Sequence, residues 1–137
     1  MDHEGTLVLI VDDEPDIRSF LADLLTTQGF HCTWADSGPA ALAQLGPLDP
    51  DVILLDIMMP GMSGLEVLRQ IRERDDVDPS VIMISCLGHP NTTLRALEEG
   101  ADHFVVKPFR VNELLDTMKQ VLDRRALGED VPDDQKS

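Results

Sequence analysis

Five short apolar runs recur along the chain, and segments with helical periodicity separate them. The runs occupy residues 7–11, 31–35, 51–57, 81–85 and 103–107. Four of them are rich in β-branched residues and do not alternate with polar residues, a pattern typical of strands that are buried on both faces. The run at 31–35 is more polar, and we expect it at the edge of the sheet.

Helical periodicity marks each intervening segment. The first segment has one apolar face, formed by Ile17, Phe20, Leu21, Leu24 and Leu25. Asp13 is expected to cap this helix, and Ser37 and Ser63 are expected to cap the second and third helices. A short fourth helix is expected at residues 90–100, and a fifth around the apolar stripe at residues 114–122.

The regular alternation of strand and helix predicts an α/β fold. We expect a (βα)5 doubly wound sandwich whose five-stranded parallel sheet has the order 2-1-3-4-5, as in flavodoxin-like proteins. A chain of 137 residues fits one domain. We place that domain at residues 1–125 and expect residues 126–137 to form an acidic polar tail or the start of a linker.

The charge of the chain disfavours some classes of partner. Its 26 acidic and 11 basic residues give a formal net charge of −15. We therefore expect no direct contact with nucleic acid, whose phosphates attract Lys and Arg, and none with anionic membranes. The sequence lacks the pattern of a signal peptide, and no apolar run approaches the ~18 residues of a membrane span. Cys32 and Cys86 are expected to be reduced, buried thiols, so we expect a cytoplasmic protein.

Polar residues follow four of the predicted strands at the edge where such sheets bind ligands. Asp12 and Asp13 follow the first strand, Asp56 the third, Ser85 the fourth and Lys107 the fifth. Taken singly, the two adjacent acids could be helix caps, the lysine a surface residue and the serine a buried hydroxyl. Their joint arrival at one sheet edge favours a shared site.

The chemistry of this set predicts a metal-assisted reaction at phosphorus. Three close carboxylates repel one another unless a cation enters, and an all-oxygen site suits Mg²⁺. A carboxylate held beside Mg²⁺ and a lysine is suited to attack phosphorus and to form an aspartyl phosphate.

Four motifs, in this order and spacing, carry a family resemblance. They are "VDDE" (11–14), "LLDIMMPGMSG" (54–64), "MIS" (83–85) and "GADHFVVKPF" (100–109). From about residue 7 to residue 125 the chain resembles a response-regulator receiver domain of two-component signal transduction, of the chemotaxis-receiver type.

The resemblance implies a role for each matching residue. Asp56 would accept the phosphoryl group, Asp13 would ligate Mg²⁺, and Asp12 would orient a metal-bound water. The backbone carbonyl of Met58 would be a further ligand, and Lys107 would pair with the phosphoryl oxygens. After phosphorylation, the hydroxyl of Ser85 would bond the new group and Phe104 would act as the aromatic switch residue.

The resemblance also implies a function. The domain would take a phosphoryl group from the phosphohistidine of a sensor histidine kinase or phosphotransfer protein and transfer it to Asp56. The change would switch a face formed by helix 4, strand 5 and helix 5, which a downstream effector protein, an output domain or a second copy would read. Such a domain is a signalling switch: it catalyses its own phosphorylation and slow dephosphorylation but does not turn over external substrates.

Several positions depart from the common pattern of the family. Phe104 stands where a tyrosine is frequent, and Cys86 stands where a smaller residue is frequent and narrows access to the phosphoryl group. Met58 and Leu87 are apolar where the family borders the path of hydrolytic water, which predicts slow loss of phosphate. Thr117 stands where receivers that dimerise through this face carry an arginine, so another dimer is possible.

Three other functions fit the sequence less well. A Mg²⁺-dependent phosphohydrolase would need a second acid where Met58 stands. A flavodoxin-like cofactor binder would need a phosphate-binding loop where the anionic "DDEPD" (12–16) stands. A degenerate receiver that serves only for docking is disfavoured because every charged residue of the site is retained.

Overall fold

A computed structural model describes residues 5–86 and 90–128 of the chain. The chain divides into two compact units, Met1–Lys107 and Pro108–Ser137. The first unit contains every strand and the first four helices, and the second contains the last helix. The predicted boundary at residue 125 and the predicted tail stay predictions, and residues 129–137 lie outside the described part.

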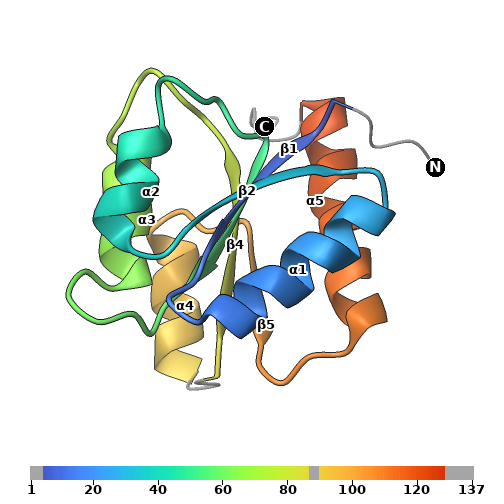
Figure 1. The fold of residues 1–137 in the computed structure, drawn as a ribbon. Coiled ribbons are helices and arrows are strands. Elements are labelled where there is room, and N and C mark those ends of the chain that lie inside the picture. The colour runs from blue at the N-terminus through green and yellow to red at the C-terminus, as the bar shows by residue number, and fades with distance from the viewer. Residues whose placement is uncertain (1–4, 87–89, 129–137) are drawn as a thin grey trace. The chain divides into compact units, whose positions relative to one another are not determined.

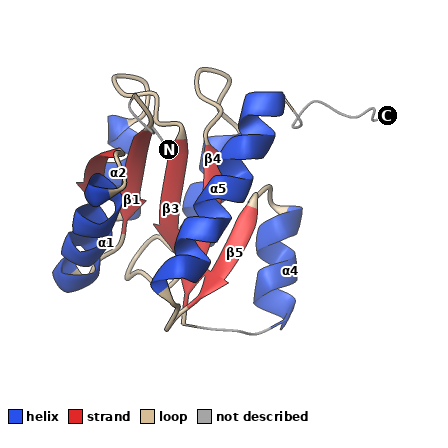
Figure 2. Cartoon of the chain, turned by 90° about the vertical axis from the view of Figure 1, so that its right-hand side faces the viewer, coloured by secondary structure: helices blue, strands red, loops and turns tan. Residues whose placement is uncertain are grey.

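The first unit is built on a five-stranded parallel sheet with the order β2-β1-β3-β4-β5, which confirms the predicted topology. The strands are β1 (Leu7–Val11), β2 (His31–Ala35), β3 (Val52–Asp56), β4 (Ser80–Ser85) and β5 (His103–Val106). Strands β1, β3, β4 and β5 run in one direction, so their carboxyl ends meet at one edge of the sheet (Figure 2). Strand β2 is more exposed and lies at the edge, as its sequence predicts.

Helices cover both faces of this sheet (Figure 1). They are α1 (Pro15–Thr27), α2 (Gly38–Gln44), α3 (Gly64–Arg72) and α4 (Pro90–Glu98). Helices α2, α3 and α4 pack over one face and α1 lies on the other. Central strand β3 is buried along its whole length because it is covered on both faces.

Local sequence signals account for most helix starts. The hydroxyls of Ser37 and Ser63 accept hydrogen bonds from backbone amides in the first turns of α2 and α3, as predicted. The predicted cap of α1 is wrong: Glu14 occupies the N-cap position without a side-chain cap, and Asp13 makes no such bond. The carboxylate of Asp12, the first residue after β1, accepts the bond from the Glu14 amide instead.

The two thiols are free, as expected, but the prediction that they are buried is wrong, because neither is fully buried. Cys32 is half-buried, and burial raises its pKa. Cys86 is exposed because it follows the end of β4, outside the sheet.

The second unit consists of helix α5 (Val111–Leu127) and its flanks. Its start is closed by a capping box in which the amide of Arg110 donates to the carboxylate of Glu113. The helix ends at Gly128, whose φ of 70° is a left-handed conformation that glycine adopts without strain. The hydroxyl of Thr117 donates to the carbonyl of Glu113 one turn earlier.

Candidate functional site

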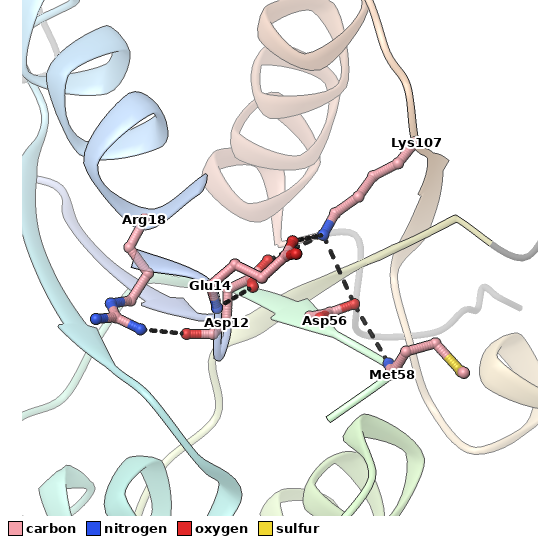
Figure 3. Close-up of polar contacts among 6 residues, drawn as sticks. All are labelled: Asp12, Glu14, Arg18, Asp56, Met58 and Lys107. Atoms are coloured by element: carbon pink, nitrogen blue, oxygen red, sulfur yellow. Dashed lines mark hydrogen bonds and ion pairs between the residues drawn. The ribbon is translucent and has the colours of Figure 1, made fainter. Parts of the chain in front are cut away.

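The carboxyl edge of the sheet gathers the predicted charged residues into one cluster, of which Figure 3 shows Asp12, Asp56 and Lys107. Asp56 is the last residue of β3, Asp12 and Asp13 directly follow β1, and Lys107 directly follows β5. The three carboxylates each offer an oxygen, and these oxygens lie within 4.8 Å of one another. Asp12 and Asp56 are only 2% and 5% exposed, whereas Asp13 is open to solvent.

Lys107 is the cation at the centre of this cluster. Its Nζ lies 3.0 Å from Asp12 Oδ2, where it donates a hydrogen bond, and 3.9 Å from Asp56 Oδ1. A third acid, Glu14, places its Oε1 3.9 Å from the same nitrogen. Burial opposes the charge on Lys107, but the bond to Asp12 and the surrounding carboxylates outweigh it, so the pKa of Lys107 is raised. The lysine is therefore charged at neutral pH.

Asp56 pays an electrostatic penalty for carrying its charge. Burial first, then the charges of Asp12 and Asp13, raise its pKa from 3.8 to about 6, although Lys107 and a bond from the Met58 amide act in the opposite direction. That amide donates to Asp56 Oδ1 at 3.3 Å. The Asp56 carboxylate is therefore ionised at neutral pH, but at a cost in free energy that a further cation would reduce.

The donor set fits Mg²⁺. Three carboxylates and one lysine leave a local excess of negative charge, which adds to the larger effect of burial in raising the pKa of Asp56. All the offered atoms are oxygens, and the exposed side of Asp13 leaves room for water ligands. Asp12, Asp13 and Asp56 are the residues that would hold the cation.

The other predicted site residues lie around this cluster in different ways. Ser85 is fully buried at the end of β4, and its backbone carbonyl accepts a hydrogen bond from the Lys107 amide at 2.8 Å. Phe104 on β5 is partly buried and packs against the core on the α2–α3–α4 face. Met58 lies in the loop after β3 with its side chain half exposed. Leu87 lies outside the described residues.

Gly64 shows why the loop after Asp56 needs a glycine. A Cβ at this position would lie 2.2 Å from the backbone oxygen of Asp56 and 2.8 Å from the Cα of Ile57. The amide of Gly64 donates to the carbonyl of Ile57 at 2.9 Å. The first turn of α3 therefore rests directly on the backbone that carries Asp56.

Two residues of the site were not predicted from the sequence. Glu14 approaches Lys107, and Arg18 donates from Nη1 to the backbone carbonyl of Asp12 at 2.8 Å. Both come from the start of α1, and Arg18 lies one helical turn after Glu14. That spacing was the available signal, because it directs both side chains toward the end of β1.

Among the described residues, no helix combines the length and the apolar character that crossing a membrane requires.

Comparisons with known proteins agree with this geometry. Residues 8–119 match the family model described as the response regulator receiver domain. The chain is 40% identical over 127 residues to the phosphate regulon transcriptional regulatory protein PhoB of Pseudomonas aeruginosa, covering 91% of this chain and 55% of that protein. It is 43% identical over 119 residues to the sensory transduction protein RegX3 of Mycobacterium bovis, covering 87% of this chain and 52% of that protein.

Among solved structures, the response regulator protein TrrA from Thermotoga maritima, in complex with Mg²⁺-BeF, superimposes with a TM-score of 0.76. It is 36% identical, and the match covers 85% of this chain and 98% of that one. The chain thus spans about half the length of the two curated relatives but nearly all of this solved chain.

Proposed function

The chain belongs to the response regulator receiver domain family, and from that membership we propose that Asp56 is its phosphoacceptor in a two-component phosphorelay. The observation that carries the proposal is the cluster itself. A buried carboxylate at the end of β3 lies within 4.8 Å of two further carboxylates and 3.9 Å from the ammonium group of Lys107. Transfer of a phosphoryl group needs a positioned nucleophile and neutralisation of charge, and this arrangement supplies both.

Each residue of the cluster has a part in the transfer. An oxygen of Asp56 forms the new bond to phosphorus while the bond from phosphorus to the donor imidazole breaks, and the electron pair leaves with the imidazole nitrogen. The Met58 amide holds the Asp56 carboxylate at Oδ1. Lys107 exchanges its contact with Asp12 for one with the phosphoryl oxygens. Bound Mg²⁺ supplies neutralisation of the charge that builds up on those oxygens.

Asp12 and Asp13 would hold that Mg²⁺ together with Asp56 and the backbone carbonyl of Met58. The solved relative with Mg²⁺-BeF supports the choice of metal. The three close carboxylates support it as well, because Lys107 alone leaves them with an excess of negative charge.

The proposed switch follows from the charge of the product. A phosphoryl group brings about −1.5 to −2 charges at neutral pH. The Ser85 hydroxyl would bond to it, and Phe104 would move into the space that the Ser85 loop leaves. The altered surface would comprise α4, β5 and α5, and it would serve an effector protein, an output domain or a second copy of the chain.

The partners are part of the same proposal. The phosphoryl donor would be a sensor histidine kinase or a phosphotransfer protein, and the transfer would take place in the cytoplasm. The relatives named as transcriptional or sensory regulators are about twice as long as the matched region, so an output domain is one form that the partner would take. The domain acts as a switch, and its own dephosphorylation is slow.

The decisive experiment is intact-mass analysis after incubation with acetyl phosphate and Mg²⁺. We expect one phosphate adduct on the wild-type chain and none on Asp56→Asn. Asp23→Asn, which removes an exposed carboxylate of α1, is the matched control and should keep the adduct. An adduct that survives Asp56→Asn would refute the assignment.

A further inference from the structure

Asp12 is held through every polar group that it possesses. Its amide donates to the carbonyl of Ala35 on β2 at 3.2 Å, and its carbonyl accepts from Arg18 at 2.8 Å. Its two carboxylate oxygens accept from the Glu14 amide at 2.9 Å and from Lys107 at 3.0 Å. The amide bond follows from strand pairing, the Glu14 bond from the helix start, and the Lys107 bond from the attraction of opposite charges. The bond from Arg18 to a backbone carbonyl follows from none of these.

The Arg18 guanidinium is itself fixed by an aromatic ring. Its carbon lies 4.3 Å from the ring centre of Trp34, a stacking that favours a planar cation over an aromatic face. Trp34 is held in turn by its backbone, since it pairs with β1 and its carbonyl accepts from Gln44 Nε2 at 2.8 Å. Trp34 is half exposed at the sheet edge, so its ring supports Arg18 by stacking and is not part of the core.

The carbonyl that Arg18 holds belongs to the peptide bond between Asp12 and Asp13. A peptide unit is planar, so fixing its carbonyl direction also fixes the plane that contains the amide and the Cα of Asp13. Asp13 is the most exposed of the three carboxylates, and its side chain does not cap the start of α1. Its direction therefore depends on the backbone that precedes it.

We propose that Arg18, stacked on Trp34, is a positioning residue that sets the Asp12–Asp13 peptide plane and so presents Asp13 to a divalent cation. The inference rests on the proposed Mg²⁺ site at Asp12, Asp13 and Asp56. Arg18 touches neither the cation nor a phosphoryl group and acts through the backbone. Groups of this kind, one step removed from the metal, change metal affinity by about 10- to 100-fold when they are removed.

The sign of the effect separates positioning from charge. Arg18 is a cation near three carboxylates, so by electrostatics alone its removal strengthens Mg²⁺ binding. A positioning role predicts weaker Mg²⁺ binding, because the Asp13 carboxylate is no longer held in the direction of the cation. A measured change in Mg²⁺ affinity therefore has opposite directions under the two explanations.

The test is calorimetric titration of Mg²⁺ alone into the metal-free protein at pH 8. We expect Arg18→Met to weaken binding about tenfold. Trp34→Leu leaves the charge unchanged and removes only the aromatic ring on which Arg18 stacks, so it should weaken Mg²⁺ binding by about two- to fivefold. Arg69→Met, which removes an equal charge from a pair with Glu66 on α3, should leave the affinity within about twofold of wild type.

A second measurement reports on the peptide plane directly. The amide of Asp13 lies in that plane, so its NMR chemical shift in the metal-free protein should change in Arg18→Met and Trp34→Leu but not in Arg69→Met. The unfolding free energy of each variant in urea shows whether the fold persists. If Arg18→Met fails to fold, the titration of Trp34→Leu decides.

The outcomes are distinguishable. Equal or tighter Mg²⁺ binding by Arg18→Met, or by Trp34→Leu where that variant decides, would overturn the positioning role and leave the metal site intact. Unchanged Mg²⁺ binding by Asp13→Asn would show that the proposed metal site itself is wrong, and the positioning role would fall with it. Weaker Mg²⁺ binding by both Arg18→Met and Trp34→Leu, together with a changed chemical shift of the Asp13 amide, would support the inference.

Discussion

Replacing Asp56 by Asn should stabilise the metal-free protein, although it removes the proposed phosphoacceptor. Asn has nearly the same shape as a protonated carboxyl group but cannot acquire a charge. The wild-type carboxyl must ionise while 5% exposed and beside two other carboxylates. The substitution therefore removes a desolvation cost and a repulsion between carboxylates that the folded state alone experiences.

The pKa of Asp56 sets the size of the effect. It is raised from 3.8 to about 6, and each unit is worth about 1.4 kcal/mol, so the difference is about 3 kcal/mol. Below pH 3.8 the carboxyl is protonated in both folded and unfolded chains, and variant and wild type should be about equally stable. As the pH rises from 3.8 through 6, the wild-type protein loses unfolding free energy because its Asp56 ionises less readily when folded, whereas the Asp56→Asn protein does not. The advantage of Asp56→Asn should therefore grow between about pH 4 and pH 7 and then stay constant.

Urea unfolding at pH 4.5, 6 and 8 in the presence of a chelator measures this difference. Asp23→Asn controls for the change in net charge and should show no comparable pH dependence. Added Mg²⁺ should shrink the advantage at pH 8, because a ligand that binds the folded wild type stabilises it. An Asp56→Asn protein that is no more stable than wild type at pH 8, or whose advantage is the same at every pH, would contradict the reasoning.

Four further substitutions test other parts of the site and its support. Gly64→Ala should cost about 3 kcal/mol or more of unfolding free energy, because its Cβ would lie 2.2 Å from a backbone oxygen; an unchanged urea midpoint would contradict the close approach. Arg72→Met should cost about 2 kcal/mol in the same assay, since it leaves the carbonyls of two loops and one carboxylate without their guanidinium donor. Met58→Asn should shorten the phosphate lifetime measured by intact mass, because an amide can position water where a half-exposed thioether cannot; an equal or longer lifetime would refute this. Lys107→Met should tighten Mg²⁺ binding about tenfold while slowing phosphorylation, because it removes a cation from the carboxylates; weaker Mg²⁺ binding would contradict the charge argument.

The sequence predicts the sheet and the cluster well because both depend on local patterns. Apolar runs that do not alternate indicate buried parallel strands, and the residue after each strand must lie at the carboxyl edge. Asp12, Asp56 and Lys107 are therefore brought together by strand order alone, although residues 12 and 107 lie far apart in the chain. The edge position of β2 likewise follows from its polar composition.

The contacts that the sequence did not predict are those between side chains and distant backbone. The stacking of Arg18 on Trp34 depends on the register between β2 and β1, which no local sequence pattern encodes. Arg72 reaches three carbonyl or carboxylate groups beyond its own helix, and its choice among them is decided by tertiary geometry. Acids favour the N-cap position, which predicts Asp13 there, but Glu14 occupies it and its amide donates to the carboxylate of Asp12.

The resting contacts of Asp12 link cation binding to the proposed chemistry. Both of its carboxylate oxygens are occupied, one by the Glu14 amide and one by Lys107. A cation, or water bound to it, that engages this carboxylate must compete with Lys107 for Oδ2. The displaced ammonium group remains within reach of Asp56, from which it is already only 3.9 Å away. In the proposed mechanism, occupation of the metal site would therefore release Lys107 toward Asp56, and the proposed positioning of Asp13 by Arg18 would affect both.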